Sequence, residues 1–367
     1  MLEIRVCFYG DYDPLYIRNR VLIKGLKLNK VELFLCNKPQ TTFKLRPLSI
    51  LRSIILQIKI YIKLFKCEYD VLFIGFPVIR SIWLPKLIKR KTILIIDPLF
   101  SYYNLLIDDH KFFKRNSVIS KLIFKLDILI FKTGDLILTD TISHLKYFSK
   151  LFNIPRSKFI NIYVGADSKI YYPLTDTRKK KKFTVTFLGS FIPAQGVEYI
   201  VEAAKILESN ENIIFELVGG LHNNPIFKKI YNRKIKENIT NIKLTPKIHY
   251  KRVPNIIQKS DIQLGIFGKS SKAQLVIPGK AYEAIAMKKP LITGDTLAIK
   301  ELFINNENCM LVDIENPKDL AEKVLLLYNN PVLRRTISEK GYQTYTHYCS
   351  PLALGKKLKS KLEEIIK

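Results

Sequence analysis

Short apolar runs alternate with longer amphipathic segments along the first half of the chain. The runs have the length and the β-branched content of buried strands, and they cover residues 3–9, 31–36, 70–75, 91–97 and 135–139. The segments between them have a helical period, and they cover residues 16–29, 47–66 and 117–133. This strand–helix alternation predicts a parallel sheet with helices on both faces.

The pattern changes at residues 165–182, which include the basic run 178–182 without an apolar period. A second alternating series follows this run. Its strand-like runs cover residues 183–188, 213–218, 242–245, 262–267, 291–293 and 309–313, and its helical segments cover residues 197–207, 279–289, 316–328 and 331–366. We therefore predict an α/β chain with two Rossmann-like domains of similar size and a central cleft. The expected parts are an N-terminal domain (1–170), a basic linker (171–182), a C-terminal domain (183–345) and a closing helix (346–367).

One stretch, residues 278–294, has the most specific pattern for chemistry. Pro278 and Gly279 open a short helix, Pro290 ends it, and an apolar strand follows. Lys280 and Glu283 are three residues apart and share a helix face. A helix N-terminus with a cation and a carboxylate one turn apart suits a diphosphate and a ribose hydroxyl. The alternative is that the helix dipole favours Glu283 and that Lys280 is solvated.

Polar residues and glycines at strand ends mark a second class of candidates. Gly10, Gly75 and Asp97 follow strands of the first series. In parallel sheets ligands bind beyond the carboxyl ends of the strands. Asp97 could contact a sugar or an acceptor, or it could cap a helix or turn. His110 and His144 are better explained as surface or structural residues.

Composition narrows the class of partner. The 367 residues are 47% hydrophobic, and 61 Lys+Arg against 32 Asp+Glu give a formal charge of +29. Such a chain should bind polyanions, although a lysine-rich composition also arises without selection for binding. The chain starts directly in a strand, lacks an apolar window for a membrane span, and has five scattered cysteines that suit reduced thiols. We therefore expect a cytoplasmic protein.

Two helical segments of the first half carry lysines and an arginine on one narrow stripe of an apolar helix. The stripes are Arg52, Lys59, Lys63 and Lys66, and Lys121, Lys125 and Lys132. Such helices can lie on the inner face of a membrane, with lysine stems reaching lipid head groups. Each stripe is equally well explained as the wet face of a helix packed on the sheet.

The chain resembles the family 4 retaining glycosyltransferases, which have the GT-B fold of two facing Rossmann-like domains. The matching stretches of the second half are residues 187–197, 216–220, 260–265, 278–294, 308–312 and 317–321. Looser matches in the first half are residues 10–14, 18–19, 139–141 and 163–167. The order and spacing of these motifs, more than any one of them, carry the resemblance.

The resemblance implies sugar transfer from a nucleoside diphosphate sugar, of the UDP or GDP type, to a hydroxyl of a glycan or lipid-linked acceptor. It implies retention of configuration, no metal and no cofactor, in the synthesis of cell-surface polysaccharide or glycolipid. Glu283 would bind the donor ribose, and the backbone of Lys247 and Ile248 would contact the base. The loop that begins at Gly189 would lie near the diphosphate. The remaining donor-side residues are Ser190, Gln195, Gly196, Gly219, Pro278 and Gly279. The acceptor side would include Gly10, Asp11, Tyr12 and Arg18, and the last helix would pack back across the domains.

The chain departs from the family pattern at three positions. Many members have a second glutamate where this chain has Leu275, and basic residues where it has Ser190 and Gln195. We expect Lys280 to supply the missing charge, with Lys269 or Lys272 as alternates. A subgroup with a Pro-x-Lys-x-x-Glu motif is more similar to this chain.

Rival functions remain for such a chain. A basic nucleic-acid-binding protein would need a stacking platform or a known module, which the sequence lacks, so we expect no nucleic acid as a partner. A nucleotide-sugar epimerase of the same fold and a catalytically inactive relative are two further candidates.

Overall fold

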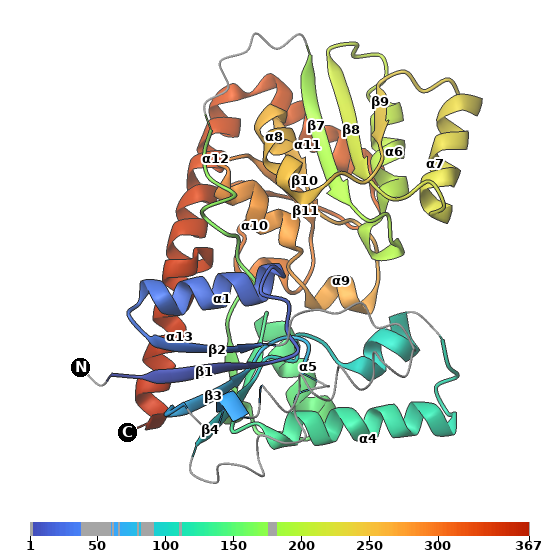
Figure 1. Cartoon of the computed structure of the whole chain (residues 1–367). Helices are drawn as coiled ribbons and strands as arrows, with labels where there is room; N and C mark the ends of the chain where they lie inside the picture. Colours follow the sequence, from blue (N-terminus) through green and yellow to red (C-terminus); the bar gives the residue numbers. More distant parts are fainter. Residues whose placement is uncertain are drawn as a thin grey trace. The chain divides into compact units, whose positions relative to one another are not determined.

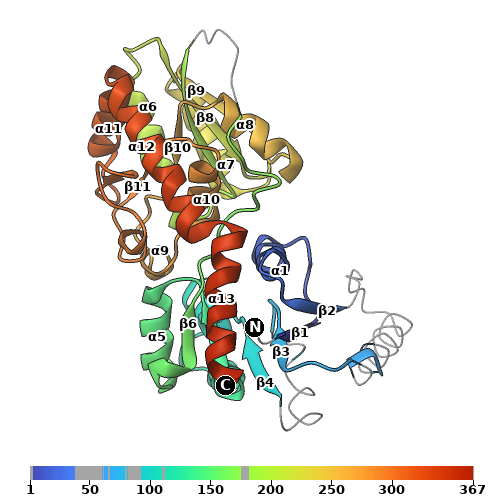
Figure 2. The same ribbon diagram turned by 90° about the vertical axis from the view of Figure 1, so that its left-hand side faces the viewer.

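The computed structural model describes residues 3–37, 60, 62–64, 67–78, 81, 92–109, 112–174 and 182–366. The chain divides into two compact units. Unit 1 comprises Met1–Val164 and Pro351–Lys367, and unit 2 comprises Gly165–Ser350. Each unit is built around its own parallel sheet (Figures 1 and 2).

Unit 1 contains a six-stranded sheet in the order β2-β1-β3-β4-β5-β6. Every neighbouring pair is parallel, and the register aligns Gly10 with Asn37 and Tyr9 with Ile74. Its strands are β1 (Arg5–Gly10), β2 (Glu32–Asn37), β3 (Val71–Ile74), β4 (Ile93–Ile96), β5 (Leu136–Thr139) and β6 (Phe159–Asn161). The order reverses between β1 and β3, so a ligand-binding crevice is expected at the carboxyl ends of these strands.

The helices of unit 1 come from both ends of the chain. They are α1 (Ile17–Leu28), the π-helical turn η1 (Asn104–Asp109), α4 (Val118–Thr133), α5 (Ile142–Phe152), the short η2 (Arg156–Lys158) and α13 (Pro351–Ile366). The C-terminal α13 packs closely on α1, because a Cβ at Gly355 would lie only 2.1 Å from the carbonyl oxygen of Gly25. The side-chain amide of Asn29 donates to the Leu352 carbonyl at 3.0 Å across the same contact.

Unit 2 contains the second six-stranded parallel sheet, in the order β12-β11-β10-β7-β8-β9. Its strands are β7 (Phe183–Gly189), β8 (Ile213–Gly219), β9 (Ile242–Thr245), β10 (Ile262–Leu264), β11 (Leu291–Gly294) and β12 (Met310–Val312). The order reverses between β7 and β10. The crevice of this sheet is therefore expected at the ends of these two strands.

The helical elements of unit 2 cover both faces of its sheet (Figures 1 and 2). They are η3 (Pro193–Gln195), α6 (Val197–Ile206), α7 (Pro225–Lys236), η4 (Tyr250–Arg252), α8 (Val253–Lys259), α9 (Ser271–Leu275), α10 (Gly279–Ala286), η5 (Ile299–Glu301), α11 (Pro317–Asn329), α12 (Pro331–Thr344) and η6 (Tyr345–Cys349). Side-chain caps fix several of these starts: Asn224, Ser270 and Asn316 each accept a backbone N–H of the first turn.

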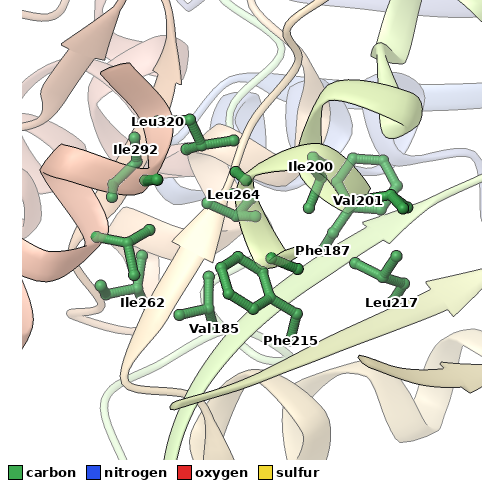
Figure 3. Close-up of a cluster of buried hydrophobic side chains, with 14 of the residues drawn as sticks. Val185, Phe187, Ile200, Val201, Phe215, Leu217, Ile262, Leu264, Ile292 and Leu320 are labelled. Atoms are coloured by element: carbon green, nitrogen blue, oxygen red, sulfur yellow. The ribbon is translucent and has the colours of Figure 1, made fainter. Parts of the chain in front are cut away.

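The core of unit 2 lies between the sheet and its helices. Figure 3 shows Val185, Phe187, Phe215, Leu264 and Ile292 with side chains of α6 and α11 in one cluster. These five side chains are at most 1% exposed. Burial of this apolar surface stabilises the fold and holds the ends of β7 and β10 in place.

The α/β alternation predicted from the sequence is confirmed in both units. The strand expected over 262–267 is shorter, because β10 ends at Leu264. A Cβ at Gly265 would lie 2.1 Å from Thr293 Oγ1, so the chain passes tightly here, and Phe267 N then donates to the Gln195 carbonyl at 3.1 Å. Most of the helix expected over 47–66, with Arg52, Lys59 and Lys66 of its basic stripe, lies outside the described residues.

Among the described residues, no helix is both long and apolar enough to cross a bilayer. None of the cysteines Cys7, Cys36, Cys67, Cys309 and Cys349 forms a disulfide, and all but Cys67 are buried.

Candidate functional site

Two glycines in register form the floor of a candidate site at the ends of β7 and β8. Gly189 pairs with Gly219. A Cβ at Gly219 would lie 1.6 Å from the Gly189 carbonyl oxygen, and its φ of +128° excludes other residues. The two strand ends can approach this closely only as glycines, and their backbone is left open to a ligand.

The loop after β7 is held by side chains that bind its own backbone. Gln195 Oε1 accepts the Phe191 N–H at 2.9 Å, and Asn224 Nδ2 donates to the Ser190 and Phe191 carbonyls at 3.2 and 3.1 Å. Gly196 has a φ of +59°, which lets the chain turn into α6. Gln195 is therefore bound to its own loop, and Ser190 is left exposed at the tip.

A cavity of about 490 Å³ opens beside this glycine pair. This volume is within the range of small-molecule sites. It brings together five residues expected on the donor side of the site: Gly189, Ser190, Gly219, Lys247 and Ile248. The Lys247 N–H donates to the Gly220 carbonyl at 2.9 Å, which fixes the segment after β9 against the end of β8.

Two further residues of this cavity are not predicted by the sequence. His249 and Tyr250 line it, and their rings lie 4.7 Å apart at an angle of 38°. Tyr250 is 41% exposed and can offer a face to a planar ligand. The sequence signal that could have indicated these two residues is their position as an aromatic pair directly after Lys247 and Ile248.

Helix α10 places Lys280 beside the same floor. The Lys280 Nζ is buried without a hydrogen-bond partner and lies 3.7 Å from the centroid of the Phe187 ring. The edge of this ring approaches the glycine loop, since a Cβ at Gly189 would lie 2.6 Å from Phe187 Cζ. Lys280 and Gly189 are therefore bridged by one aromatic ring.

Burial controls the charge of Lys280. It lowers the pKa of the Lys280 ammonium to about 7, and the nearby Glu283 carboxylate opposes this shift. A buried cation with no hydrogen-bond acceptor is costly unless an anion is added. At the start of the same helix, a Cβ at Gly279 would meet no atom within 4 Å. The N-terminus of α10, with Pro278 as its N-cap, thus borders open space.

Two other lysines, Lys269 and Lys272, are candidates for the positive charge at the diphosphate site, and they lie in different surroundings from Lys280. Lys269 is exposed, and Lys272 is half-buried on α9, whose C-terminal residue is Leu275. Of these three lysines, only Lys280 has a buried nitrogen without a hydrogen-bond acceptor. Glu283 is half-buried one turn further along α10.

In unit 1, the backbone around Gly10 is held by Ser81. The Asp11 N–H donates to Ser81 Oγ at 2.8 Å, and a Cβ at Gly10 would lie 2.8 Å from the same oxygen. Tyr12 is fully buried, and its ring packs edge-on against Phe8 at 4.7 Å. Gly10 and Asp11 lie at the carboxyl end of β1, whereas Tyr12 has no exposed surface for a ligand.

Arg18 and Asp97 form a buried ion pair. Arg18 Nε and Nη2 donate to the two Asp97 oxygens at 2.8 and 3.1 Å, and Nη1 donates to the Ile162 and Tyr163 carbonyls. Both side chains are 0% exposed, and burial raises the pKa of Asp97 against the opposing charge of Arg18. The pair ties α1 to the end of β4 and to the chain after β6. The sequence allows Asp97 to contact a sugar or an acceptor, or to cap a helix or turn, and the family resemblance implies an acceptor-side role for Arg18. In the structure the two side chains contact each other.

The remaining candidates lie away from this constellation or outside the described residues. His144 lies in the first turn of α5, with Nδ1 2.5 Å from Asp140 Oδ1 and its ring stacked on Phe148. His110 lies outside the described residues. The described residues contain no group of three or more His, Cys, Asp or Glu side chains able to hold a metal ion.

The second half of the chain is similar in sequence to a known family of proteins. Residues 175–344 match the family model of group 1 glycosyl transferases. The chain is also 31% identical over 193 residues to MJ1178, an uncharacterized glycosyltransferase of Methanocaldococcus jannaschii. That match covers 51% of this chain and 48% of the relative, so it spans about half of the relative's length.

Solved structures are similar over the whole chain. HepE of Anabaena, solved in complex with UDP, has a TM-score of 0.73 at 13% identity, with 99% of this chain and 100% of that chain covered. Sucrose-phosphate synthase of Thermosynechococcus elongatus has a TM-score of 0.71 at 13% identity, with 99% of each chain covered. The chain therefore has the GT-B fold, as the sequence predicted.

Proposed function

We propose that this protein is a glycosyltransferase that transfers a sugar from a nucleoside diphosphate sugar to a hydroxyl group. The observation that carries the proposal is the arrangement of the glycine pair, the cavity and the buried Lys280 ammonium at one edge of the unit 2 sheet. Supporting it are the group 1 family match and the GT-B neighbours solved with UDP and with UDP-glucose.

In this proposal the cavity takes the nucleoside and α10 takes the diphosphate. The base would lie against Lys247, Ile248 and the Tyr250 ring, and the Glu283 carboxylate would accept the ribose hydroxyls. The open N-terminus of α10 and the backbone at Gly189 and Gly219 would donate to phosphate oxygens. We propose that the nucleotide of the donor is UDP or GDP.

Lys280 is proposed to stabilise the leaving group. Transfer breaks the bond between the sugar and the diphosphate, and negative charge then collects on the departing phosphate oxygens. A positive charge held in a water-poor site stabilises that charge strongly. Because Lys280 would supply this charge from the protein, we propose a metal-independent reaction of the retaining, family 4 type with the Pro-x-Lys-x-x-Glu motif.

The acceptor is proposed to be a glycan or lipid-linked hydroxyl, in cell-surface polysaccharide or glycolipid synthesis on the cytoplasmic side of a membrane. Gly10 and Asp11 at the crevice of unit 1 are the proposed contacts. The buried Arg18–Asp97 pair would hold these loops in place without touching the sugar.

An epimerase or an inactive relative of the same fold is distinguished by its products. A transferase releases free nucleoside diphosphate at a rate that depends on the acceptor, whereas an epimerase converts the donor sugar without one. An inactive relative binds the donor and does neither. Incubating a matching donor with and without a panel of acceptors separates the three.

The first test is thermal unfolding of the protein with UDP, GDP and their sugars, alongside Glu283→Ala. A ligand present at 100 times its dissociation constant stabilises the fold by roughly 2.7 kcal/mol. We expect one base to raise the melting temperature and Glu283→Ala to reduce that shift by more than half. The matched control is Glu322→Ala on α11, an exposed glutamate that should leave the shift intact. No shift with any nucleotide would overturn the proposal.

A further inference from the structure

The outward face of α4 and the segment before it expose an unusual amount of apolar surface. Val118 is 74% exposed, Leu122 59%, Leu129 47% and Ile119 47%, and Phe112 and Phe113 just before the helix are 65% and 38% exposed. Single exposed apolar residues are ordinary on a protein surface. Six within 18 residues form a patch, and such patches mark binding surfaces.

The exposed aliphatic residues and the lysines of α4 form two adjacent stripes. Counting 100° per residue, Val118, Leu122 and Leu129 lie within about 40° of one another. Lys121, Lys125 and Lys132 fall within the neighbouring ~40°. The lysine stripe predicted from sequence therefore borders an apolar ridge on the same side of the helix.

The inner face of α4 is anchored without using this ridge. Phe131 packs against Phe148 and Phe152 of α5 at centroid distances of 4.9 and 4.5 Å. The buried Asp127 carboxylate accepts from Ser101 Oγ at 2.6 Å and from the Tyr103 N–H at 2.8 Å. The outward residues are therefore not needed to attach α4 to the sheet, which separates this surface from the ordinary wet face of a packed helix.

The charge of this surface is positive throughout. Between Phe112 and Thr133 the only acidic residue is the buried Asp127. Arg115 pairs with Asp108 at 2.9 Å. Lys114, Lys121, Lys125 and Lys132 form no ion pair within the described part of the chain.

We infer that α4 and residues 112–117 form a docking surface for a lipid bilayer with anionic head groups. The ridge and the two phenylalanines enter the interface, and the lysines contact lipid phosphates through their long stems. The use of this surface, to hold a transferase at a lipid-linked acceptor, rests on the proposed function, whereas the binding itself does not.

Other occupants fit this surface less well. Nucleic acid would pair with the lysines but has no use for an aliphatic ridge. A second copy docked through the same face would bring lysine stripes against one another, because a two-fold interface is self-complementary. A bilayer satisfies both the apolar and the cationic stripe.

The test is co-flotation of the full chain with phosphatidylcholine vesicles, with and without phosphatidylglycerol, at low and high salt. We expect binding only with the anionic lipid and a decrease at high salt. Lys121→Glu/Lys125→Glu should reduce the partition coefficient at least tenfold. Leu122→Ser/Leu129→Ser should reduce it by a similar factor without changing the net charge.

The matched control is Lys228→Glu/Lys229→Glu, the same charge change on exposed lysines of α7 in unit 2. It should change partition less than twofold. Equal loss in both charge variants would mean that net charge alone drives binding, and would overturn the inference. Full binding by the serine variant, no binding by the wild type, or a concentration-dependent dimer that the serine variant abolishes would each overturn it as well.

Thermal unfolding of every variant, with and without the nucleotide found in the panel, shows that the fold and the donor site are intact. Flotation uses no nucleotide and the nucleotide panel uses no vesicle. Failure of the docking surface and failure of the proposed function are therefore separate results.

Discussion

The Lys280 ammonium is buried against an aromatic ring and has a pKa of about 7 when no ligand is present. Near neutral pH a large share of molecules would therefore carry an uncharged amine at the proposed diphosphate site. A bound diphosphate favours the charged form and must raise this pKa. Donor binding and proton uptake are thereby linked at one residue.

This linkage predicts a pH dependence of donor affinity. Below pH ~7 Lys280 is already charged and affinity is highest. As pH rises above the free pKa, affinity should fall by up to about tenfold per pH unit, until the pKa of the complex is reached. Calorimetric titration with an intact nucleotide sugar between about pH 6 and 9 measures this, since its diphosphate does not titrate there.

Lys280→Met keeps the length of the side chain and removes the titrating group. It should bind the donor more weakly at neutral pH and with little pH dependence. Lys272→Met, on α9, should behave as wild type. A slope that survives in Lys280→Met would assign the titration to another residue.

At the same scale, the sequence could place Lys280 and Glu283 on one helix face from their spacing alone. It could not separate Lys280 from Lys269 and Lys272, because the burial of its nitrogen depends on Phe187, which is distant in sequence. Nor could it show that Arg18 and Asp97 meet, since their contact needs α1 packed against the end of β4. Pairings between distant residues are set by tertiary packing, which one sequence does not display.

At the scale of elements, the strand β8 and the helix α10 each contribute a glycine, and the two glycines are under different constraints. Gly219 has a positive φ and no room for a Cβ, whereas a Cβ at Gly279 would meet no atom within 4 Å. The first constraint concerns folding of the strand pair. The second leaves space that a ligand can occupy.

Gly219→Ala is therefore expected to lower the free energy of unfolding of unit 2 by at least about 2 kcal/mol, through backbone strain and the clash with Gly189. Gly279→Ala should change it by less than about 1 kcal/mol, and it should weaken donor binding if phosphates approach this backbone. Hydrogen exchange of the β7 and β8 amides measures the first effect, and titration with the nucleotide measures the second. Equal stability of the two variants would contradict the assignment of strain to Gly219.

Strands and helices were predicted correctly where the apolar periodicity was clear. The strand end was predicted wrongly where buried apolar residues continue into a closely packed loop. The strand now seen as β9 was predicted over the same residues, 242–245, because its pattern is bounded by polar segments. β10 is shorter than predicted because the apolar residues Ile266 and Phe267 are buried in a loop and not in a strand. Apolar character reports burial, and burial is shared by strands and by packed loops.

At the scale of the whole molecule, the path of the chain sets which residues stabilise which unit. Unit 2 is one continuous segment, whereas unit 1 is completed by α13 from the far end of the sequence. A chain ending at Ser350 should therefore lose hydrogen-exchange protection in α1 and β1 of unit 1. The strands of unit 2 should keep their protection, and the nucleotide should still stabilise them.

A chain that ends at Glu363 keeps most of α13 and serves as the control for truncation. Loss of protection in both units of the shorter chain would mean that unit 2 also depends on α13. The sequence predicted two α/β domains and, through the family resemblance, a last helix that packs back across them, but it could not show that this helix packs on α1 of the first unit. That assignment depends on the close approach of Gly25 and Gly355, which are far apart in the chain.

The contact between α1 and α13 also imposes an order on biosynthesis. Residues 165–350 must all be translated after the unit 1 sheet and before α13 leaves the ribosome. At 5–20 residues per second, this takes on the order of ten to forty seconds. During that time the strands of unit 2 can begin to fold, while the surface of α1 around Gly25 is not yet covered by α13. Unit 1 is thus begun before unit 2 and completed after it, and its apolar α1 surface is open to non-native contacts in the interval.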